Sequence, residues 1–511
     1  MPGVMLDFIA HFSRTTPNKL AAVDLASGRR WTYSEFDAAI WRMVHVLRER
    51  VGDTDGVRIA TLSRNSVDML IIHFACVRSG AIFVPLNWRL AAPEIEFLIG
   101  DCRPALLVYE EMFAHLVPGT YAGRTLVQGE SRDELNDAIA AAPQPERLGV
   151  GVAVEPDRTI TLLYSSGTTG KPKGVVVTQM NAFAGGLNLC LGTQVTPASV
   201  FLCEMPLFHT AGLMAAARAP LLMGATVLVS QKFDAEVTYS RLADEALGIT
   251  HYFSVTQMAM MMRQIPGFDG RKLSRLTAYV TGGAPNPEAH VKRWLDDGVP
   301  MLNGWGMSEN SSCLAMPPGD FDRIRAKAHT VGVPHLTVEI KIVDPQGNEV
   351  PRGTVGELWT RGLNTTPGYW ERPELNEKSF KDGWFKTGDA GFVDEDGFYS
   401  LVDRIKDMFI SGGENVYPAE IEATITEMHE VGEVAVIGVP DARWGEVGCA
   451  FVVPAPGASL SPEQVIAHCK VQLAGYKVPK SVVLTDSIPR TASGKVQKHL
   501  LREIWDRQAA A

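Results

Sequence analysis

The chain has 511 residues, too many for one ordinary hydrophobic core, so two or more domains are expected. An apolar fraction of 46% and a charged fraction of 21% are typical of a globular protein. The formal net charge of −10 gives no electrostatic support for a nucleic-acid partner, since such domains usually carry a basic face.

The cysteines and the apolar runs indicate the compartment. The seven cysteines are scattered without a CxxC pair, which argues against a disulfide framework or a zinc site and favours a reducing cytoplasm. No basic residue precedes Arg14, so the N-terminus is a poor signal peptide. Arg218 and Pro220 interrupt the most membrane-like run, at 211–230, where a buried helix followed by a strand is expected. We therefore expect a cytoplasmic protein without an integral membrane segment.

The first half of the chain alternates helical and strand patterns. Thr32 with Glu35 three residues later predicts a capping box ahead of apolar residues at helical spacing. Nearly continuous apolar runs at 57–62 and 81–86 are typical of strands covered on both faces, and similar runs recur at 226–232 and 276–283. This alternation predicts a doubly wound α/β architecture.

From about Thr337 the pattern changes to short alternating segments separated by turns such as PQG, PRG and EDG. These predict antiparallel strands in a barrel-like or small sheet. The last part of the chain has the strands and helices of a small α+β domain. The boundary is expected between Asp403 and Ser411, which divides the chain into residues 1–403 and 404–511.

The stretch 161–178 reads TLLYSSGTTGKPKGVVVT, a buried strand followed by a loop rich in glycine, hydroxyl groups and lysine. A P-loop needs Gly, four residues and then Gly-Lys-Ser/Thr, whereas here Gly167 is followed after two residues by Gly170-Lys171 and then Pro172. Hydroxyl groups, close backbone N–H groups and ammonium ions on one loop suit a polyphosphate. The alternative is a solvated turn between two strands.

Five motifs occur along the chain: YSSGTTGKPKG in this loop, GWGMSE at Gly304–Glu309, KTGD at Lys386–Asp389, DRIKDMFISGGENVYPAEIE at Asp403–Glu422 and PRTASGK at Pro489–Lys495. In content and order they resemble the adenylate-forming superfamily of acyl-CoA synthetases, carrier-loading adenylation domains and luciferases. The resemblance spans nearly the whole chain. Within this superfamily, the motif segments most resemble those of bacterial fatty-acyl-CoA synthetases and 4-coumarate-type ligases.

The resemblance implies an α/β fold: a large N-terminal domain of doubly wound sheets with a β-barrel-like subdomain, and a small mobile α+β C-terminal domain. It implies that a small-molecule carboxylic acid attacks the α-phosphorus of ATP, giving acyl-adenylate and pyrophosphate, and that coenzyme A then displaces AMP. Both reactants of the first step are anionic, so Mg²⁺ is expected to neutralise part of the charge. A homodimer is a possible assembly.

Three residues are implied as catalytic. Lys495 matches the lysine that bridges carboxylate and α-phosphate, and Glu309 matches the metal-linked glutamate. Thr169 belongs to the phosphate loop. Without the flanking motif, Glu309 would be interpreted as a helix cap.

The resemblance also implies a nucleotide site. Trp305 stands where the family usually has tyrosine, and its indole is expected to stack on adenine; the alternative is a core aromatic residue. Asp389 and Arg404 match the pair that binds the ribose hydroxyls. The nucleotide-binding residues implied are Ser165, Ser166, Gly167, Thr168, Thr169, Gly170, Lys173, Gly283, Ala284, Pro285, Asn303, Gly304, Trp305, Gly306, Met307, Ser308, Asp389, Arg404 and Lys495.

The same resemblance places a hinge at Lys406, where a small backbone change could reorient the C-terminal domain. Ile410 and Gly412 stand where plant-type ligases carry lysines, so any role of those lysines is not transferred. For Trp444 a structural role is the alternative. The residues implied for CoA are Lys232, Gly412, Gly413, Glu414 and Trp444.

The acyl site is implied at His209, Gly282 and Gly304, although a lone histidine is more often a core residue. Methionines at 258 and 260–262 suit a hydrophobic acid, or belong to a buried helix. A medium- or long-chain fatty acid and an aryl or cyclic acid both remain open. The alternative function is a stand-alone adenylation enzyme that passes the acyl group to a carrier protein. A luciferase-type oxygenase shares the motifs, and a non-catalytic nucleotide-binding protein would not need all of them.

Overall fold

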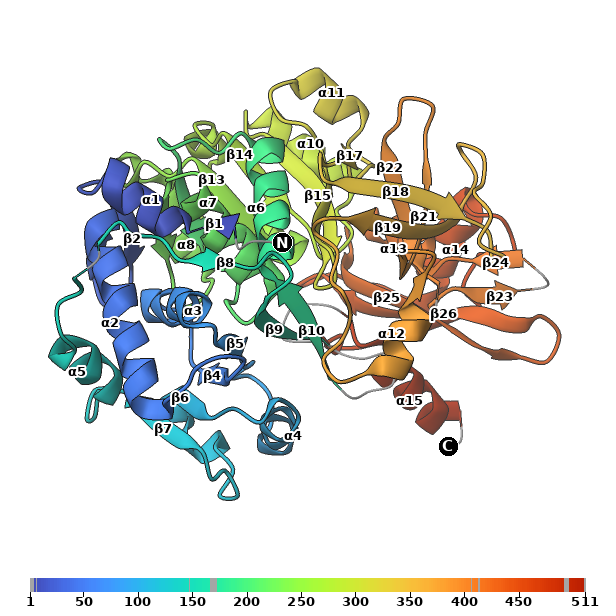
Figure 1. Ribbon diagram of the computed structural model, residues 1–511. Helices are drawn as coiled ribbons and strands as arrows, with labels where there is room; N and C mark the ends of the chain where they lie inside the picture. The colour runs from blue at the N-terminus through green and yellow to red at the C-terminus, as the bar shows by residue number, and fades with distance from the viewer. Residues whose placement is uncertain are drawn as a thin grey trace.

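The computed structural model describes residues 4–5, 7–146, 148–165, 172–405, 407–411, 414–490 and 496–509. Figure 1 shows two helix-covered sheets in the N-terminal part (blue to yellow-green), then an antiparallel sheet in gold and orange and a C-terminal unit in orange to red. The α/β fold class predicted from the sequence is confirmed.

A six-stranded sheet, counted within the described ranges, carries the phosphate-loop segment at its edge. Its order is β10-β9-β5-β4-β6-β7, parallel except for the β9/β10 pair. Strands β4 and β5 lie at the predicted apolar runs. The strands are β4 (Arg58–Leu62), β5 (Ile82–Pro85), β6 (Leu106–Glu110), β7 (Arg124–Gln128), β9 (Thr159–Ser165) and β10 (Lys173–Thr178). The helices of this part are α2 (Tyr33–Val51), α3 (Val67–Ser79), α4 (Ala92–Cys102), η1 (Glu111–Leu116) and α5 (Glu134–Ala141).

The second sheet has nine strands among the residues described, in the order β17-β16-β15-β14-β13-β11-β12-β2-β3. Its inner strands are parallel, and β3, β16 and β17 are antiparallel at the edges. The strands are β2 (Leu20–Asp24), β3 (Arg30–Thr32), β11 (Val200–Cys203), β12 (Thr226–Val229), β13 (His251–Ser254), β14 (Ala278–Thr281), β15 (Met301–Met307), β16 (Ser311–Ala315) and β17 (Val333–Pro334). The helices are α1 (Phe8–Thr15), α6 (Gln179–Thr193), η2 (Ala211–Arg218), α7 (Ala219–Leu222), α8 (Ala235–Ala243), η3 (Glu245–Leu247), α9 (Thr256–Arg263), η4 (Gly270–Leu273), α10 (Glu288–Asp296) and α11 (Phe321–Ala326).

Two smaller units follow, as predicted: an antiparallel sheet and then an α+β unit in which β26 and β27 are parallel. The first is a curled sheet of β18 (Val338–Val343), β19 (Gly356–Gly362), β20 (Phe380–Lys381), β21 (Trp384–Val393) and β22 (Tyr399–Arg404), with α12 (Pro373–Ser379). The C-terminal unit contains β23 (Phe409–Ser411), β24 (Glu414–Val416), β25 (Val431–Asp441), β26 (Gly445–Pro454), β27 (Ser481–Leu484), α13 (Pro418–Thr426), α14 (Pro462–Gln472) and α15 (Lys498–Ala509). Near the N-terminus β1 (Val4–Met5) pairs with β8 (Ala153–Val154).

Two local predictions can be compared with the structure. The Thr32 hydroxyl accepts from the Glu35 N–H and the Glu35 carboxylate accepts from the Thr32 N–H, so the capping box is confirmed. The run 211–230 is a helix followed by strand β12, but its first part, η2, is a π-helix. Gly212 lets η2 approach the preceding loop, since a Cβ there would lie 2.1 Å from the Pro206 carbonyl oxygen. No helix within the described ranges is long and apolar enough to cross a membrane.

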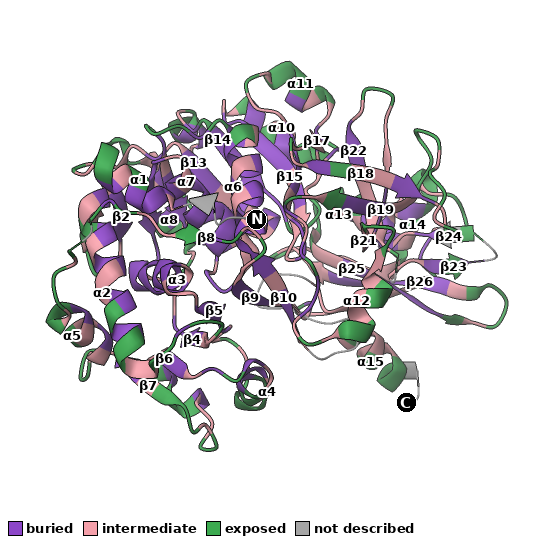
Figure 2. Cartoon of the chain, in the orientation of Figure 1, coloured by how far each residue is buried: buried purple, intermediate pink, exposed green. Residues whose placement is uncertain are grey.

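The core lies mainly on the strands and the helices between them. Figure 2 shows α3 and much of α6 as buried, whereas α2 and α5 expose one face to solvent. Separate apolar clusters fill the N-terminal sheets, the antiparallel sheet and the C-terminal unit. The segment around β15 and β21, where the motifs meet, therefore lies on a packed scaffold.

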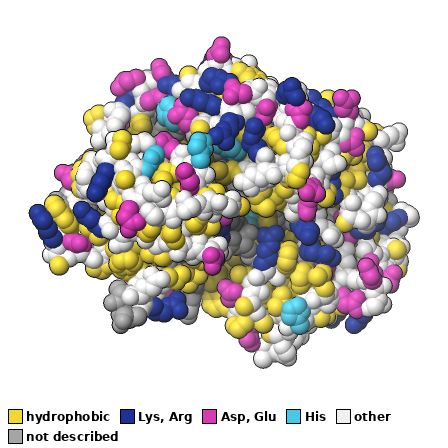
Figure 3. Space-filling view, turned by 180° about the vertical axis from the view of Figure 1, so that it is seen from behind, with side chains coloured by type: hydrophobic (Ala, Val, Ile, Leu, Met, Phe, Trp, Pro, Cys, Tyr) yellow, Lys and Arg dark blue, Asp and Glu magenta, His cyan; other side chains and the backbone are white. Residues whose placement is uncertain are grey.

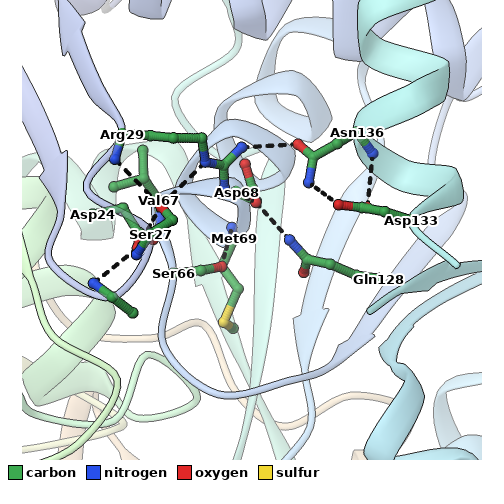
Figure 4. A network of polar contacts seen from close by, with 11 residues as sticks. Asp24, Ser27, Arg29, Ser66, Val67, Asp68, Met69, Gln128, Asp133 and Asn136 are labelled. Atoms are coloured by element: carbon green, nitrogen blue, oxygen red, sulfur yellow. Dashed lines mark hydrogen bonds and ion pairs between the residues drawn. The ribbon is translucent and has the colours of Figure 1, made fainter. Parts of the chain in front are cut away.

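A buried polar network joins the two N-terminal sheets, as Figure 4 shows. The Asp68 carboxylate on α3 accepts hydrogen bonds from Arg29 and from Gln128 at the end of β7. Arg29 also donates to Asn136 on α5, 2.9 Å away. Burial raises the pKa of Asp68, and Arg29 opposes that rise. Because the partners come from both sheets, the network fixes how one sheet sits on the other.

Candidate active site

The structure describes both ends of the phosphate loop. Strand β9 ends at Ser165 and β10 begins at Lys173, and these two residues are paired in an antiparallel register. The loop is thus the connection of a hairpin at the edge of the six-stranded sheet, as predicted for a loop leaving a buried strand. The predictions for Ser166, Gly167, Thr168, Thr169, Gly170 and Lys171 lie outside the described residues.

Lys173 leads to a cluster around the predicted metal-linked glutamate. Its ammonium lies 3.5 Å from a Glu309 carboxylate oxygen and 3.8 Å from the centre of the Tyr369 ring. The Tyr369 hydroxyl donates to the same oxygen over 2.9 Å. Burial raises the pKa of Tyr369, and the Glu309 charge raises it further. A buried carboxylate beside a lysine at the end of the phosphate hairpin suits Mg²⁺ and a polyphosphate.

Small residues let the two central motif segments approach each other. Gly282 follows β14, and a Cβ there would lie 3.1 Å from the Gly304 carbonyl oxygen on β15. Gly283 has φ of +82°, which favours glycine. A Cβ on Gly306 would lie 1.7 Å from the Ser311 carbonyl oxygen, so glycine is required where β15 meets β16. The remaining residues predicted here are Ala284 and Pro285 after β14, and Met307 and Ser308 at the end of β15.

Trp305 and Asp389 are in direct contact. The indole N–H donates to one Asp389 carboxylate oxygen over 2.8 Å, and the Arg404 Nε lies 2.5 Å from the other. Trp305 is only 8% exposed and Asp389 only 6%. Strand pairing of β21 with β22 places Asp389 opposite Arg404. The structure thus brings together three residues that the sequence assigned to the nucleotide.

The Asn303 side chain forms hydrogen bonds with other residues of the protein. Its amide donates to the carbonyl oxygens of Ala328 and Thr330, and its oxygen accepts from Thr281 and Asn286. The side chain therefore ties β15 to neighbouring segments. A nucleotide contact of this residue would have to come from its backbone and stays a prediction.

His209 lies in the loop before η2, with its ring 5.0 Å from that of Phe208. The next residue, Thr210, borders a recess that reaches Glu309. Ser311 and Asn181 also line this recess, together with apolar groups such as Met214. Glu309 and Thr210, the neighbour of the predicted acyl-site residue His209, therefore border one partly polar space. Of the α9 methionines, Met262 is buried in the core and Met261 is 45% exposed.

Glu414 and Trp444, both predicted for CoA, lie in neighbouring parts of the C-terminal unit. Ser411 pairs both with Glu414 on β24 and with Gly445 on β26, which brings Glu414 near the turn that carries Trp444. Trp444 is 38% exposed, and Arg443 lies over its ring. Lys232 lies in the turn after β12, where its carbonyl oxygen accepts from Ser230. The predictions for Lys406, Gly412 and Gly413 concern positions outside the described residues.

Lys495 also lies outside them, but both flanks of its loop are described. Arg490 and Val496 form an antiparallel bridge, and Arg490 is paired with Glu433 on β25. After the loop, Lys498 at the start of α15 lies 3.0 Å from the Glu422 carboxylate. The loop thus leaves and re-enters an anchored framework.

Comparison with known proteins identifies the family. The family model described as AMP-binding enzyme matches residues 9–370, and a second, described as AMP-binding enzyme C-terminal domain, matches residues 420–495. This chain belongs to the AMP-binding enzyme family. The enzyme is 38% identical to feruloyl-CoA synthase of Amycolatopsis sp over 93% of this chain and 94% of that protein. It is 34% identical to the long-chain-fatty-acid–CoA ligase FadD13 of Mycobacterium tuberculosis over 96% of both.

Solved structures of AMP-binding enzymes are similar over nearly their whole length. ATP-bound MatB from Rhodopseudomonas palustris gives a TM-score of 0.89 at 32% identity, covering 97% of this chain and 99% of that one. Apo MatB gives 0.79 at the same identity, covering 98% and 99%. MenE from Bacillus subtilis in complex with ATP and magnesium ion gives 0.84 at 28% identity, covering 98% and 99%. The present arrangement is therefore more similar to ATP-bound MatB than to apo MatB.

The enzyme is an AMP-forming acid–thiol ligase, as the motifs implied. Relatives of known structure bind ATP and Mg²⁺. Figure 3 shows Lys and Arg side chains at the margins of a hollow near the middle of the face opposite that of Figure 1. Among the described residues there is no group of three or more His, Cys, Asp or Glu that could hold a metal ion by itself.

Sequence reasoning missed one feature of this site. Tyr369 lies in no motif that we recognised, and the bridge between it and Val175 on β10 joins segments far apart in the chain.

The cysteines are distributed over the whole chain. All seven thiols are unpaired and buried, and burial raises the pKa of each. They are Cys76, Cys102, Cys190, Cys203, Cys313, Cys449 and Cys469.

Proposed function

We propose that the enzyme activates an aryl carboxylic acid of the hydroxycinnamic type and joins it to CoA. The recess bordered by Thr210 and Glu309 carries the proposal, because the hydroxyl groups of Thr210 and Ser311 line it beside apolar side chains. A hydroxylated ring can satisfy such groups, whereas an alkyl chain would leave them without partners. Similarity to a feruloyl-CoA synthase supports the same class.

In the first step the carboxylate oxygen bonds to the α-phosphorus of ATP, and the bond from that phosphorus to the bridging oxygen breaks, so pyrophosphate leaves. The phosphate loop and Lys173 hold the departing pyrophosphate, and Lys495 stabilises the charge shared by carboxylate and α-phosphate. Asp389 and Arg404 hold the ribose. Mg²⁺, bound through Glu309, would neutralise phosphate charge.

In the second step the CoA thiolate attacks the acyl carbonyl carbon, and the carbon–oxygen bond to AMP breaks. Glu414 and Trp444 lie in neighbouring parts of the C-terminal unit, which supports a shared path for pantetheine. Gly412 and Gly413 would keep this path free of side chains, and Lys232 would face the CoA nucleotide.

We assign residues 1–403 and 404–511 to two domains hinged at Lys406. The carboxylate of Asp403, just before the hinge, accepts from the Ala419 N–H at the start of α13. The greater similarity to ATP-bound than to apo MatB supports the view that this chain adopts one of two domain orientations. The two family models leave residues 371–419 between them, and this interval contains the hinge.

Replacing Lys406 with Pro is expected to impair thioester formation more than adenylation, because a fixed φ at the hinge opposes reorientation. Pyrophosphate release measures the first step, and conversion of preformed acyl-adenylate by CoA measures the second. Equal loss in both would remove the support for a hinge at this residue. Lys470→Pro is not a suitable control because it breaks α14, so Lys406→Ala serves instead.

The substrate class is tested with an acid panel. We expect kcat/KM to be about tenfold or more higher for hydroxycinnamic acids than for saturated C8–C18 acids, since a site with hydrogen-bonding groups rejects a ligand that leaves them unpaired. Acid-dependent pyrophosphate release and CoA-dependent AMP release give the values. A preference for the saturated acids would instead show that the substrate is a fatty acid. Similarity to FadD13 favours that class.

The alternative acceptor is tested in the same assay. If a phosphopantetheinylated carrier protein took the acyl group and CoA did not, the stand-alone adenylation function would replace the one proposed.

Cytoplasmic location and a homodimer stay predictions. Buried, unpaired thiols support the first, and light scattering of the purified chain measures the second.

A further inference from the structure

The indole N–H of Trp305 links two parts of the nucleotide site. Trp305 lies on β15 of the nine-stranded sheet, and Asp389 lies on β21 of the antiparallel sheet. The hydrogen bond of 2.8 Å between them therefore crosses from one sheet to the other.

The Trp305 ring is held on several sides. It packs in an apolar cluster with Cys313 and Leu314 of β16, Val338 of β18 and Leu358 of β19. A side chain in such a cluster has few rotamers open to it. Only 8% of the Trp305 surface is exposed. The indole N–H is therefore a donor at a fixed position.

The Asp389 carboxylate receives that donor and the Arg404 guanidinium, and the Asp389 backbone is anchored separately. Arg404 lies at its second oxygen, and the Asp389 N–H donates to the Thr387 hydroxyl over 3.0 Å. The Thr387 hydroxyl in turn donates to the Leu358 carbonyl oxygen. A carboxylate has about four acceptor positions, so two neighbouring hydroxyl groups of a ligand could still donate to it. Its orientation decides whether they meet it at good geometry.

We propose that Trp305 is a positioning residue: its indole N–H holds Asp389 in the orientation that accepts hydrogen bonds from the ribose hydroxyls of ATP. The proposal rests on the nucleotide site proposed above. It gives Trp305 a role through Asp389 in addition to the stacking on adenine that the sequence predicted. Arg404 supplies charge to the same carboxylate, but it lies on β22 next to the hinge, whereas Trp305 lies within the N-terminal scaffold.

The test compares ATP with 2′-deoxyATP and 3′-deoxyATP in acid-dependent pyrophosphate release. Trp305→Phe keeps a ring but removes the donor, and we expect kcat/KM for ATP to fall about tenfold, as for loss of a hydrogen bond to a charged group. The values for the deoxy analogues should change by less than about threefold, because they lack a hydroxyl that Asp389 would hold. The preference for ATP therefore shrinks in the variant.

Trp359→Phe is the matched control. Trp359 lies on β19, is 5% exposed, and its N–H has no hydrogen-bond partner among the described residues. It should leave the preference for ATP unchanged. If Trp305→Phe does not fold, β-(3-benzothienyl)alanine at position 305 keeps the ring shape and lacks only the N–H.

Asp389→Asn tests the ribose site separately from the role of Trp305. If it leaves the preference for ATP intact, the ribose site itself is wrong. If it abolishes the preference while Trp305→Phe retains it, the ribose site stands and the role of Trp305 is overturned. If both lose it, the double variant should lose no more than Asp389→Asn alone, since both changes act on one interaction.

Discussion

Lys495→Ala is expected to lower the rate of acyl-adenylate formation by about 10²–10³, while thioester formation from preformed acyl-adenylate stays near that of the unchanged enzyme. The reason is electrostatic, since the first step brings a carboxylate against a triphosphate. An ammonium between them stabilises the negative charge that develops on the transferring oxygens. The second step involves a neutral thioester product and does not need that ammonium.

The framework around the loop makes this a test of the lysine itself. Arg490, Val496 and Lys498 hold both ends of the loop, so removal of one side chain within it should not displace its flanks. Pyrophosphate release in a single turnover measures the first step, and thioester formation from synthetic acyl-adenylate measures the second. Lys470→Ala, on an exposed position of α14, is the control. Equal losses in both steps would show that Lys495 does not act in adenylation alone.

Glu309→Gln is expected to lower adenylation about 10²-fold at limiting Mg²⁺ and to raise the Mg²⁺ concentration needed for half-maximal rate. The amide oxygen can still accept from the Tyr369 hydroxyl, so the change removes charge more than packing. It also leaves the Lys173 ammonium beside a neutral group. The loss should shrink as Mg²⁺ is increased, because saturating metal compensates for weaker binding.

Two further variants sharpen this test. Glu339→Gln removes an exposed carboxylate paired with Arg361. It should change neither the adenylation rate nor the Mg²⁺ concentration needed for half-maximal rate. Tyr369→Phe removes the hydrogen bond to Glu309 but keeps its charge, and should cost less than Glu309→Gln. A Glu309→Gln enzyme with unchanged Mg²⁺ dependence would contradict the assignment of the metal to this carboxylate.

Features with local causes could be predicted from the sequence. The capping box at Thr32 needs only two side chains three residues apart, and the strands β4 and β5 need only short apolar runs. The change of pattern near Thr337 likewise marks the antiparallel sheet that begins at Val338. The order of the motifs led to the family because each motif is a contiguous stretch.

Contacts between distant segments could not be predicted in this way. Tyr369 reaches Glu309 only because the segment 368–370 runs beside β10, and no local pattern encodes that. The hydrogen bond from the Trp305 indole to Asp389 likewise depends on the packing of two sheets. The π-helix at η2 depends on how closely Gly212 approaches the loop before it, which hydrophobic periodicity does not report.

The burial of the thiols has a chemical consequence. An acyl-adenylate is a mixed anhydride and acylates any thiolate within reach. In this enzyme every cysteine is buried and its pKa is raised, so each stays a protonated thiol away from solvent. The activated acyl group therefore meets no sulfur nucleophile of the chain that could compete with coenzyme A, and the enzyme is protected from acylating its own cysteines.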